Sequence, residues 1–534
     1  MENPKQVTPQ QLIKHTVNIM ASKWRGRGRA PLCDALVLWA QALAFFGLAL
    51  YFAPLLASGQ TSDEAFTRAT AALAAATPRA QADPTHPIFH VASPAQWMND
   101  PNGPIFYKGI YHLFYQLHPF SDGSGPKYWG HVRSRNLVKW EHLPIALCPS
   151  GDLGEAEIWS GCCTMNGRGQ PMIFYTSIAP GRSAMDHAEQ WAATSDDDLL
   201  HWRKSPANPV LSEALHGERK IYDWRDPFVF HIAGKTFLVT GGNLNQAKGG
   251  QAVVNIYQAQ NPELTKWTYR GIMFQHPDPE ARTVECPNFF QLGRKWVLVM
   301  SPYGKVQYFI GDFDAATCRF QALARGLLDF GPNFYAPNTM QLREGRRLVW
   351  GWVTGFPEGR GWNGCLTLPR ELTLSHKTEP ADSWALKQEP APELIKLRGQ
   401  KVRWQNLALS DHATVLSLPN TNALEIRANL DLQPAKMLSL EFTSGEASAA
   451  PIELVVRGSE LSVMESKTKL QQTQKGLKLR IFFDRSVMEV FANGTACFTR
   501  KINPLGSDPA LALRVEEGTA RAELVEAWPM KTVW

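Results

Sequence analysis

The dominant pattern from residue 100 to about residue 375 is a recurring pair of short apolar strands joined by a glycine turn. The unit is clear at "PFVFHI", a glycine and "TFLVTGG", and again at "NFFQL", a glycine and "KWVLVMS". The turn glycines fall near residues 109, 167, 234, 293 and 345, at intervals of 52–67 residues. Repeats of this size, with several short strands in each, are typical of propeller blades, so residues 87–375 are predicted to form a five-bladed β-propeller.

The pattern changes after the fifth repeat. Residues 376–402 are polar and contain prolines, which predicts a linker. From residue 403 to 534, segments such as "ALEIRANLDLQ" and "PIELVVRG" alternate apolar and polar residues, and Asn493-Gly494 marks a hairpin turn. This alternation predicts an antiparallel β-sandwich, for which we expect a structural role. The chain is therefore predicted to be all-β, with a five-bladed β-propeller followed by a C-terminal β-sandwich.

The first 59 residues are basic up to Arg29 and then apolar over residues 35–57. This order, followed by small residues at the end of the run, is typical of a secretory signal peptide. The 23-residue run is also long enough for an uncleaved membrane anchor, and both interpretations stay open. Either one predicts a secreted or periplasmic protein. Residues 60–86, rich in Ala, Thr and Pro, predict a flexible lead-in without a core of its own.

The net charge and the cysteine spacing exclude some classes of function for this protein. The net charge is +6, and the first 59 residues contribute +4, from six basic and two acidic residues. The remaining charge of about +2 (6 − 4) is too low for a nucleic-acid-binding surface. The eight cysteines lack C-x-x-C spacing, which argues against a zinc or redox motif, and any disulfide pairing stays open. We expect membrane contact only through an uncleaved N-terminal segment; the oligomeric state is not predicted.

Three acidic residues occupy corresponding positions in three of the repeats. Asp100 lies nine residues before its turn glycine, and Asp226 and Glu285 each lie eight before theirs. Equivalent positions on different blades face the same end of a propeller's channel, so the three carboxylates are predicted to converge on one pocket. Clustered carboxylates repel one another, and at least one should hold a proton near neutral pH. An ionised carboxylate beside a protonated carboxyl is what cleavage of a glycosidic bond requires.

Two other interpretations of these acids stay open. Arg225 and Asp226 could form a structural ion pair, with Glu285 as an ordinary surface acid. Alternatively, the carboxylates could bind a divalent metal ion, although their spacing matches no known metal-binding loop.

The motifs around these acids make the sequence resemble glycoside hydrolase family 32, the group of invertases, inulinases and levanases. The resemblance extends in the family's order from residue 88 to about residue 530, and it implies the same propeller and sandwich. The matching motifs are "WMNDPNG" (97–103), "YHLFYQ" (111–116), "WGH" (129–131), "WSG" (159–161), "RDP" (225–227), "EC" (285–286), "NFYAPN" (333–338), "LPREL" (368–372) and "DRSVMEVF" (484–491).

The resemblance assigns a role to each acid. Asp100 corresponds to the family's nucleophile, Glu285 to its acid/base and Asp226 to its transition-state stabiliser. Arg225 would keep Asp226 ionised and orient it toward sugar hydroxyls. The residues that the resemblance implies for substrate binding are Trp97, Asn99, Gln116, Trp129, Trp159, Ser160, Arg225 and, at the rim, Trp362.

Three positions depart from the family's usual pattern. Trp159 replaces a Phe, Asn288 stands where an Asp is common, and Asn363 replaces a small residue beside the rim tryptophan.

The resemblance thus implies an exported, retaining, exo-acting β-fructosidase that needs no cofactor or metal. It would release terminal fructose from sucrose, inulin or levan. The reaction would pass through a covalent fructosyl-Asp100 intermediate. A fructosyltransferase would form the same intermediate and is the first alternative. A catalytically inactive sugar-binding relative is the second.

Overall fold

The computed structural model describes residues 62–534 except 186, 197, 245–249, 378–382, 434, 445–449 and 471–475. The predicted signal peptide or anchor at residues 1–59 lies outside the described residues. No helix within the described part of the chain is long and apolar enough to cross a bilayer. The described residues belong to one compact unit, and it contains both a propeller and a sandwich.

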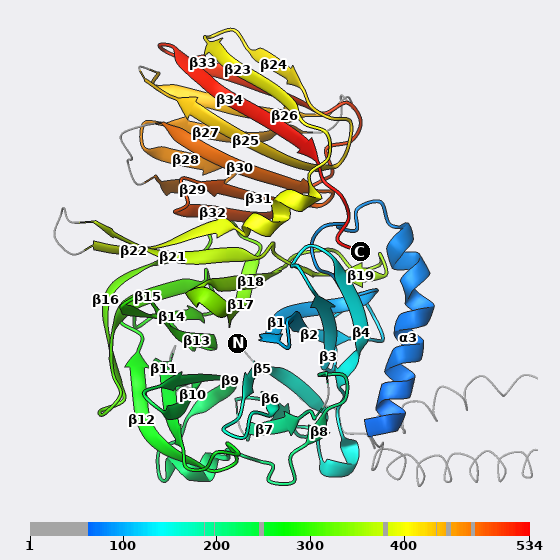
Figure 1. The fold of residues 1–534 in the computed structure, drawn as a ribbon, viewed down its shortest axis with the longest axis vertical. Coiled ribbons are helices and arrows are strands. Elements are labelled where there is room, and N and C mark those ends of the chain that lie inside the picture. Colours follow the sequence, from blue (N-terminus) through cyan, green and yellow to red (C-terminus); the bar gives the residue numbers. More distant parts are fainter. Residues whose placement is uncertain are drawn as a thin grey trace, which may run out of the picture. The chain divides into compact units, whose positions relative to one another are not determined.

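Five antiparallel sheets surround a common axis and form the propeller (Figure 1). The predicted apolar hairpins are the two inner strands of each blade, and turn residues such as Gly109 adopt positive φ (83°) as tight turns require. The first blade also carries a short parallel strand on its inner edge, β19 (Trp362–Asn363). The other strands of the first two blades are β1 (Gln96–Tyr107), β2 (Ile110–His118), β3 (Tyr128–Ser134), β4 (Trp140–Leu147), β5 (Glu157–Met165), β6 (Pro171–Ile178), β7 (Glu189–Thr194) and β8 (Arg203–Lys204).

The remaining three blades repeat the same order from the axis outward. In the fifth blade, β20 (Cys365–Leu366) pairs with the end of β18 before the chain turns into β21. The other strands of these blades are β9 (Tyr222–Ile232), β10 (Lys235–Asn243), β11 (Ala252–Ala259), β12 (Trp267–Gln275), β13 (Glu285–Leu292), β14 (Lys295–Ser301), β15 (Gln307–Asp314), β16 (Arg319–Leu327), β17 (Phe334–Gln341), β18 (Arg347–Val353), β21 (Arg370–Lys377) and β22 (Ser383–Pro390).

A β-bulge interrupts the first long strand of every blade, with two residues on that strand opposite one on the next. Such bulges redirect side chains, and they let a proline stand inside a strand. Asp226, at one of them, has φ of 60°, a conformation that few non-glycine residues adopt. The bulged pairs are Asn99-Asp100, Trp159-Ser160, Asp226-Pro227, Cys286-Pro287 and Ala336-Pro337.

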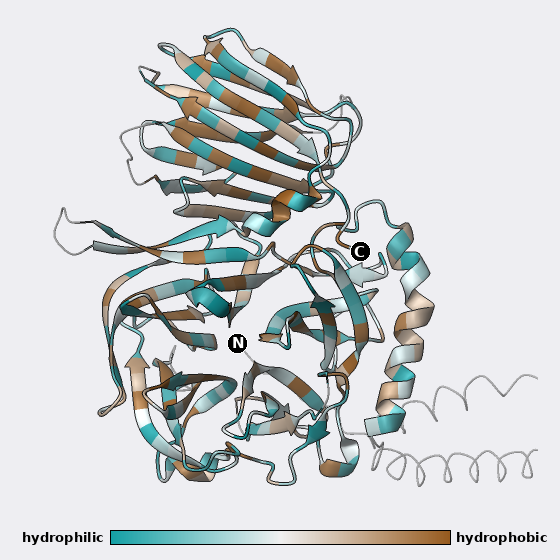
Figure 2. Ribbon diagram, viewed as in Figure 1, coloured by the Kyte–Doolittle hydropathy of each residue, from teal (hydrophilic) through white to brown (hydrophobic). Residues whose placement is uncertain are grey.

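The C-terminal residues form the predicted sandwich of two six-stranded antiparallel sheets. Apolar and polar residues alternate along its strands in Figure 2, as a sheet with one buried face requires. Asn493 and Gly494 both have positive φ (52° and 67°), as expected for the hairpin turn between β31 and β32. The strands are β23 (Val402–Leu409), β24 (Thr414–Ser417), β25 (Ala423–Asp431), β26 (Met437–Thr443), β27 (Ile452–Arg457), β28 (Glu460–Val463), β29 (Ser466–Lys469), β30 (Leu477–Asp484), β31 (Val487–Ala492), β32 (Ala496–Lys501), β33 (Ala510–Glu516) and β34 (Ala520–Pro529).

The predicted flexible lead-in at residues 60–86 is wrong, because most of it is the helix α3 (Ser62–Ala82). Alanine is the strongest helix former, and the segment is rich in it. Ala65 and Ala69, one helical turn apart, are buried together with Ala80. They join the apolar cluster of the first and fifth blades, so the helix packs on the propeller.

The predicted linker at residues 376–402 is also wrong over most of its length. The hairpin of β21 and β22 continues to Pro390 and completes the fifth blade, and a 3₁₀ helix, η4 (Pro392–Leu397), then leads into the sandwich. Polar residues mark this hairpin because it is the outer edge of a blade.

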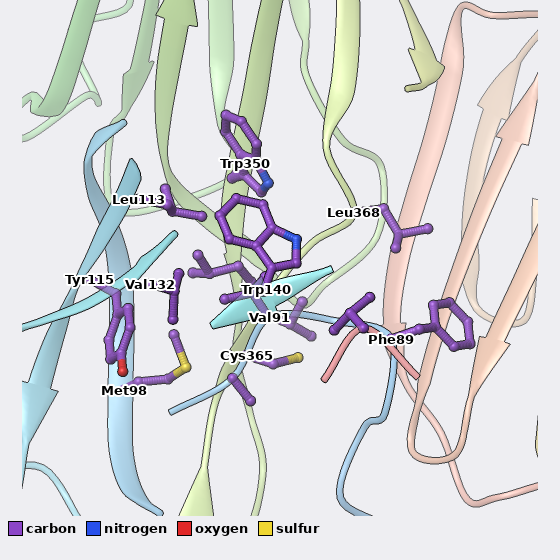
Figure 3. Close-up of a cluster of buried hydrophobic side chains, with 14 of the residues drawn as sticks. Phe89, Val91, Met98, Leu113, Tyr115, Val132, Trp140, Trp350, Cys365 and Leu368 are labelled. Atoms are coloured by element: carbon purple, nitrogen blue, oxygen red, sulfur yellow. The ribbon is translucent and has the colours of Figure 1, made fainter. Parts of the chain in front are cut away.

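One apolar core joins the helix, the first and fifth blades and the sandwich. Figure 3 shows part of it, with Trp140 from β4 lying among Val91, Val132 and Trp350. Phe482, Phe491 and Cys497 contribute from the sandwich side. The sandwich therefore shares buried surface with the propeller.

Candidate active site

A pocket of about 480 Å³ lies where the inner strands begin. The bulges of the first, second, third and fourth blades direct side chains into it, so residues far apart in the sequence converge. Within the described chain, no group of three His, Cys, Asp or Glu side chains is arranged to hold a metal ion. The sequence-predicted residues that line the pocket are Trp97, Asn99, Asp100, Gln116, Trp159, Ser160, Arg225, Asp226 and Glu285.

Asp100 is held by hydrogen bonds on both carboxylate oxygens. Ser160 Oγ donates to Oδ2 at 2.5 Å, and Asn99 Nδ2 donates to Oδ1 at 3.0 Å. Gln116 links the two donors, because its Oε1 accepts from Asn99 (3.0 Å) and its Nε2 donates to Ser160 (2.7 Å). Trp97 fixes Asn99 in turn through its indole N–H (2.9 Å). The carboxylate is therefore immobilised before any substrate arrives.

Glu285 receives a donor on each oxygen. Arg225 Nη2 donates to Oε1, and the Tyr335 hydroxyl donates to Oε2. Both donors stand, like Glu285 itself, one residue before the bulge of their strand, and their strands flank the strand of Glu285. Cys286, the next residue, places its Sγ 3.5 Å from Asp100 Oδ2, so the strand that carries Glu285 reaches the first acid directly.

Arg225 was expected to pair with Asp226, and the structure contains this ion pair together with two closer contacts. Its Nη1 donates to Asp223 and its Nη2 to Glu285, whereas its Nε is 3.7 Å from Asp226 Oδ2. Asp226 Oδ2 also accepts the backbone N–H of Cys286 at 2.8 Å.

Burial dominates the electrostatics of the two aspartates. Removal from water raises the pKa of Asp100, although Ser160 and Asn99 oppose the shift. Burial likewise raises the pKa of Asp226 to about 7; Arg225 opposes this shift, and the nearby Glu285 adds to it. The Asp226 carboxyl therefore loses its proton at a higher pH than an ordinary aspartate does.

Buried, hydrogen-bonded carboxyls that meet in one pocket can perform acid–base and nucleophilic chemistry. The family model for the N-terminal domain of family 32 glycosyl hydrolases matches residues 90–390, and the C-terminal model matches residues 393–529. The chain belongs to glycoside hydrolase family 32.

Family 32 relatives match over most of the chain. The levanase of Bacillus subtilis is 31% identical over 502 residues, covering 84% of this chain and 71% of its own. A sucrose-6-phosphate hydrolase of Escherichia coli is 29% identical and covers 83% of this chain and 95% of its own. Among solved structures, a β-fructofuranosidase of Bombyx mori aligns with a TM-score of 0.75 at 27% identity, covering 88% of this chain and 99% of that one. The protein is thus a glycoside hydrolase.

Two tryptophans expected in the site of this family 32 hydrolase are not in it. Trp129 is fully buried between the first two blades, because it lies on the third strand from the axis, and its indole N–H donates to Trp159 O (3.0 Å). Trp362 is 1% exposed and packs against Phe356 and His86 at ring separations of 4.9 and 4.7 Å. Trp129 thus contacts a residue that lines the pocket, whereas Trp362 packs against residues outside it.

Other lining residues were not singled out from the sequence. Tyr335 could have been found from the sequence, because it stands in "NFYAPN" one residue before the bulge of the fifth blade. Arg225 and Glu285 stand at the same position before the bulges of the third and fourth blades. Lys127 lies in the loop before β3, which carries no periodic signal. The unpredicted lining residues are Ser124, Gly125, Pro126, Lys127, Glu157, Cys286, Tyr335 and Trp352.

Two of the departures from the family pattern have structural explanations. Asn288 accepts from Thr339 N (2.9 Å) and donates to Pro337 O (3.0 Å), so it ties the fourth blade to the fifth. Asn363 donates to Asp122 O (3.0 Å) and Phe356 O (3.3 Å), and so fixes the loop beside β19. Trp159 lines the pocket, and its indole N–H donates to Glu157 (2.9 Å).

Proposed function

We propose that this family 32 hydrolase is a retaining, exo-acting β-fructosidase that releases terminal fructose from sucrose, inulin or levan. The observation that carries the proposal is the convergence of Asp100, Asp226 and Glu285 on one pocket whose inner end is made of buried polar side chains. The names of the relatives, among them a levanase and a β-fructofuranosidase, agree with a fructose-releasing reaction.

Asp100 is the proposed nucleophile, attacking the anomeric carbon of fructose to form a covalent fructosyl-enzyme. Its two fixed hydrogen bonds support this role, because they hold the carboxylate in one orientation and limit the loss of entropy on attack. Water then cleaves the ester and restores Asp100.

Glu285 is the proposed proton donor to the leaving oxygen and the base that later activates water. Tyr335 supports this exchange of roles, because a hydroxyl both donates and accepts hydrogen bonds. It can therefore stay bonded to Glu285 whether or not that carboxyl carries a proton. Arg225 would stabilise the carboxylate after the proton has left.

Asp226 is the proposed stabiliser of the fructosyl transition state. Every hydrogen bond between its carboxylate and the described part of the chain goes to Oδ2, which leaves Oδ1 for a sugar hydroxyl. An anionic acceptor there would bind the hydroxyls more strongly as positive charge develops on the sugar ring.

The inner end of the pocket supports exo action. Asn99, Gln116 and Ser160 close it and bond to one another, and all three are buried. A terminal fructose can enter such a site, whereas an internal unit of a fructan has no passage for the chain beyond it.

A second candidate substrate is sucrose phosphorylated on its glucose unit. Lys127 supports it: this lysine lines the pocket, and its Nζ donates only to Ser124 Oγ (2.9 Å) and Gly125 O (2.5 Å) among the described residues. It forms no ion pair with a described carboxylate and could bind a phosphate. Several relatives are named sucrose-6-phosphate hydrolases.

The deciding experiment measures kcat/KM of the wild type and Asp100→Asn on sucrose, sucrose 6-phosphate, inulin and levan. We expect Asp100→Asn to lose activity by several orders of magnitude on every substrate, while the exposed control Asp198→Asn keeps it. Near-full activity of Asp100→Asn would overturn the nucleophile. A preference for sucrose 6-phosphate that is lost in Lys127→Met would establish the second candidate. Products larger than the substrate at high sucrose would instead indicate a fructosyltransferase.

A further inference from the structure

A second cavity of about 460 Å³ lies at the other ends of the inner strands. The active-site pocket is lined by residues near the starts of β1, β5, β9 and β13, whereas this cavity is lined by later residues of the same strands and of β17. Exposed side chains of His231, Gln291 and Gln341 stand at its rim, so it is open to solvent. It is a separate site that the reaction does not use.

Arg347 on β18 lines this cavity with an uncompensated charge. The residue is only 8% exposed, and it forms no ion pair with any described carboxylate. Its Nη1 donates to Thr339 Oγ1 (3.0 Å) and its Nη2 to Gln341 Oε1 (2.7 Å), both neutral groups. Its Nε is buried without a partner. Burial without a counter-charge lowers the pKa of Arg347 to about 9, so it remains a cation at neutral pH.

The surroundings add no negative charge. None of the described residues that line the cavity is an aspartate or a glutamate. The guanidinium lies 4.1 Å from the centre of the Phe290 ring, which compensates the charge only in part. A second cation, Arg343, lies over Phe106 at the cavity wall (5.4 Å). Buried charges in proteins are normally paired, so we expect Arg347 to bind an anion from solution.

We propose that this cavity is a binding site for a small oxyanion, such as inorganic phosphate or sulfate, centred on Arg347. A guanidinium presents a planar fork of N–H groups that matches two oxygens of such an anion, and three of its five N–H groups have no bond to the described residues. The cavity volume lies in the range of ordinary ligand sites.

The test is calorimetric titration of the full chain with inorganic phosphate at constant ionic strength. We expect the wild type to bind one phosphate in this cavity and Arg347→Met to bind it about tenfold more weakly or not at all, because charge-assisted hydrogen bonds are lost. Arg133→Gln, which removes an arginine paired with Glu141 on the surface, should bind as the wild type does.

Lys127 in the catalytic pocket is the competing phosphate site, so Lys127→Met is titrated in parallel. Binding that is lost in Lys127→Met and kept in Arg347→Met would overturn the proposal, as would the absence of any binding to the wild type at millimolar phosphate. Should Arg347→Met fail to fold, Arg347→Lys keeps the charge and removes the fork. Weakened binding by that variant supports the proposal, and unchanged binding refutes it.

Discussion

Replacing His90 with glutamine tests the buried charges that connect the propeller to the sandwich. His90 Nδ1 lies 2.8 Å from Asp484 Oδ2, and its Nε2 lies 3.0 Å from Glu489 Oε1. Asp484 also accepts the backbone N–H groups of Ile88 and Phe89 at 2.8 and 2.7 Å. These three side chains are fully buried, and Glu489 is also paired with the buried Arg370, so the proton on His90 is held by two carboxylates in a low-dielectric site.

The magnitude follows from the pKa of His90. Burial alone would lower it, but the hydrogen bonds to Asp484 and Glu489 outweigh burial and raise it from 6.5 to about 9. One pKa unit corresponds to about 1.4 kcal/mol, so the protonated imidazole contributes about 3 kcal/mol to folding. Because the pKa is raised in the folded state, this stability is fully present below pH 6.5 and is lost as the pH rises through about 9.

The assay is urea unfolding of the wild type and His90→Gln at a series of pH values between 6 and 10. We expect the free energy of unfolding to differ most between the two proteins at the acid end, and this difference to shrink by about 3 kcal/mol toward the alkaline end. His412→Gln is the control, because His412 pairs with Asp411 on the surface. A difference that stays constant with pH would refute the reasoning, since it would mean that His90 is neutral in the folded protein.

Further predictions concern the site, the helix and the N-terminus. Tyr335→Phe should lower kcat/KM on sucrose by about ten- to a hundredfold without loss of stability, because Glu285 loses a hydrogen-bond donor. An unchanged kcat/KM would mean that the Tyr335 hydroxyl has no role in the reaction. The kcat/KM profile of the wild type should contain a limb near pH 7 from the coupled acids that Asp226→Asn removes; an identical profile in the variant would contradict the raised pKa of Asp226. Ala69→Asp should lower the melting temperature because it places a charge in the contact of α3 with the propeller, whereas an unchanged melting temperature would mean that the helix adds no stability. We also propose that the protein is exported: the enzyme should be found in the culture medium or periplasm, and recovery only from the cytoplasm would exclude export.

Local sequence predicted the blades, the sandwich and the three acids that line the pocket. Apolar hairpins at regular intervals predicted the blades, and two-residue alternation predicted the sandwich. Both patterns are local, because successive side chains of a strand point to opposite faces of the sheet. Asp100, Asp226 and Glu285 were placed together because they precede corresponding turns. The resemblance to family 32 rests on short contiguous motifs of the same kind.

Only the tertiary structure decided which side chains meet. The sequence gives no sign that Arg225 also donates to Glu285, because that contact depends on an acid 60 residues away. Trp129 and Trp362 carry family motifs yet are buried, since the strand order places one outside the inner ring and closure of the loop beside β19 covers the other. The uncompensated charge of Arg347 exists only because five strand ends surround it without contributing a carboxylate. Periodicity reports which face of a strand is buried, whereas contacts between blades depend on how the whole ring closes.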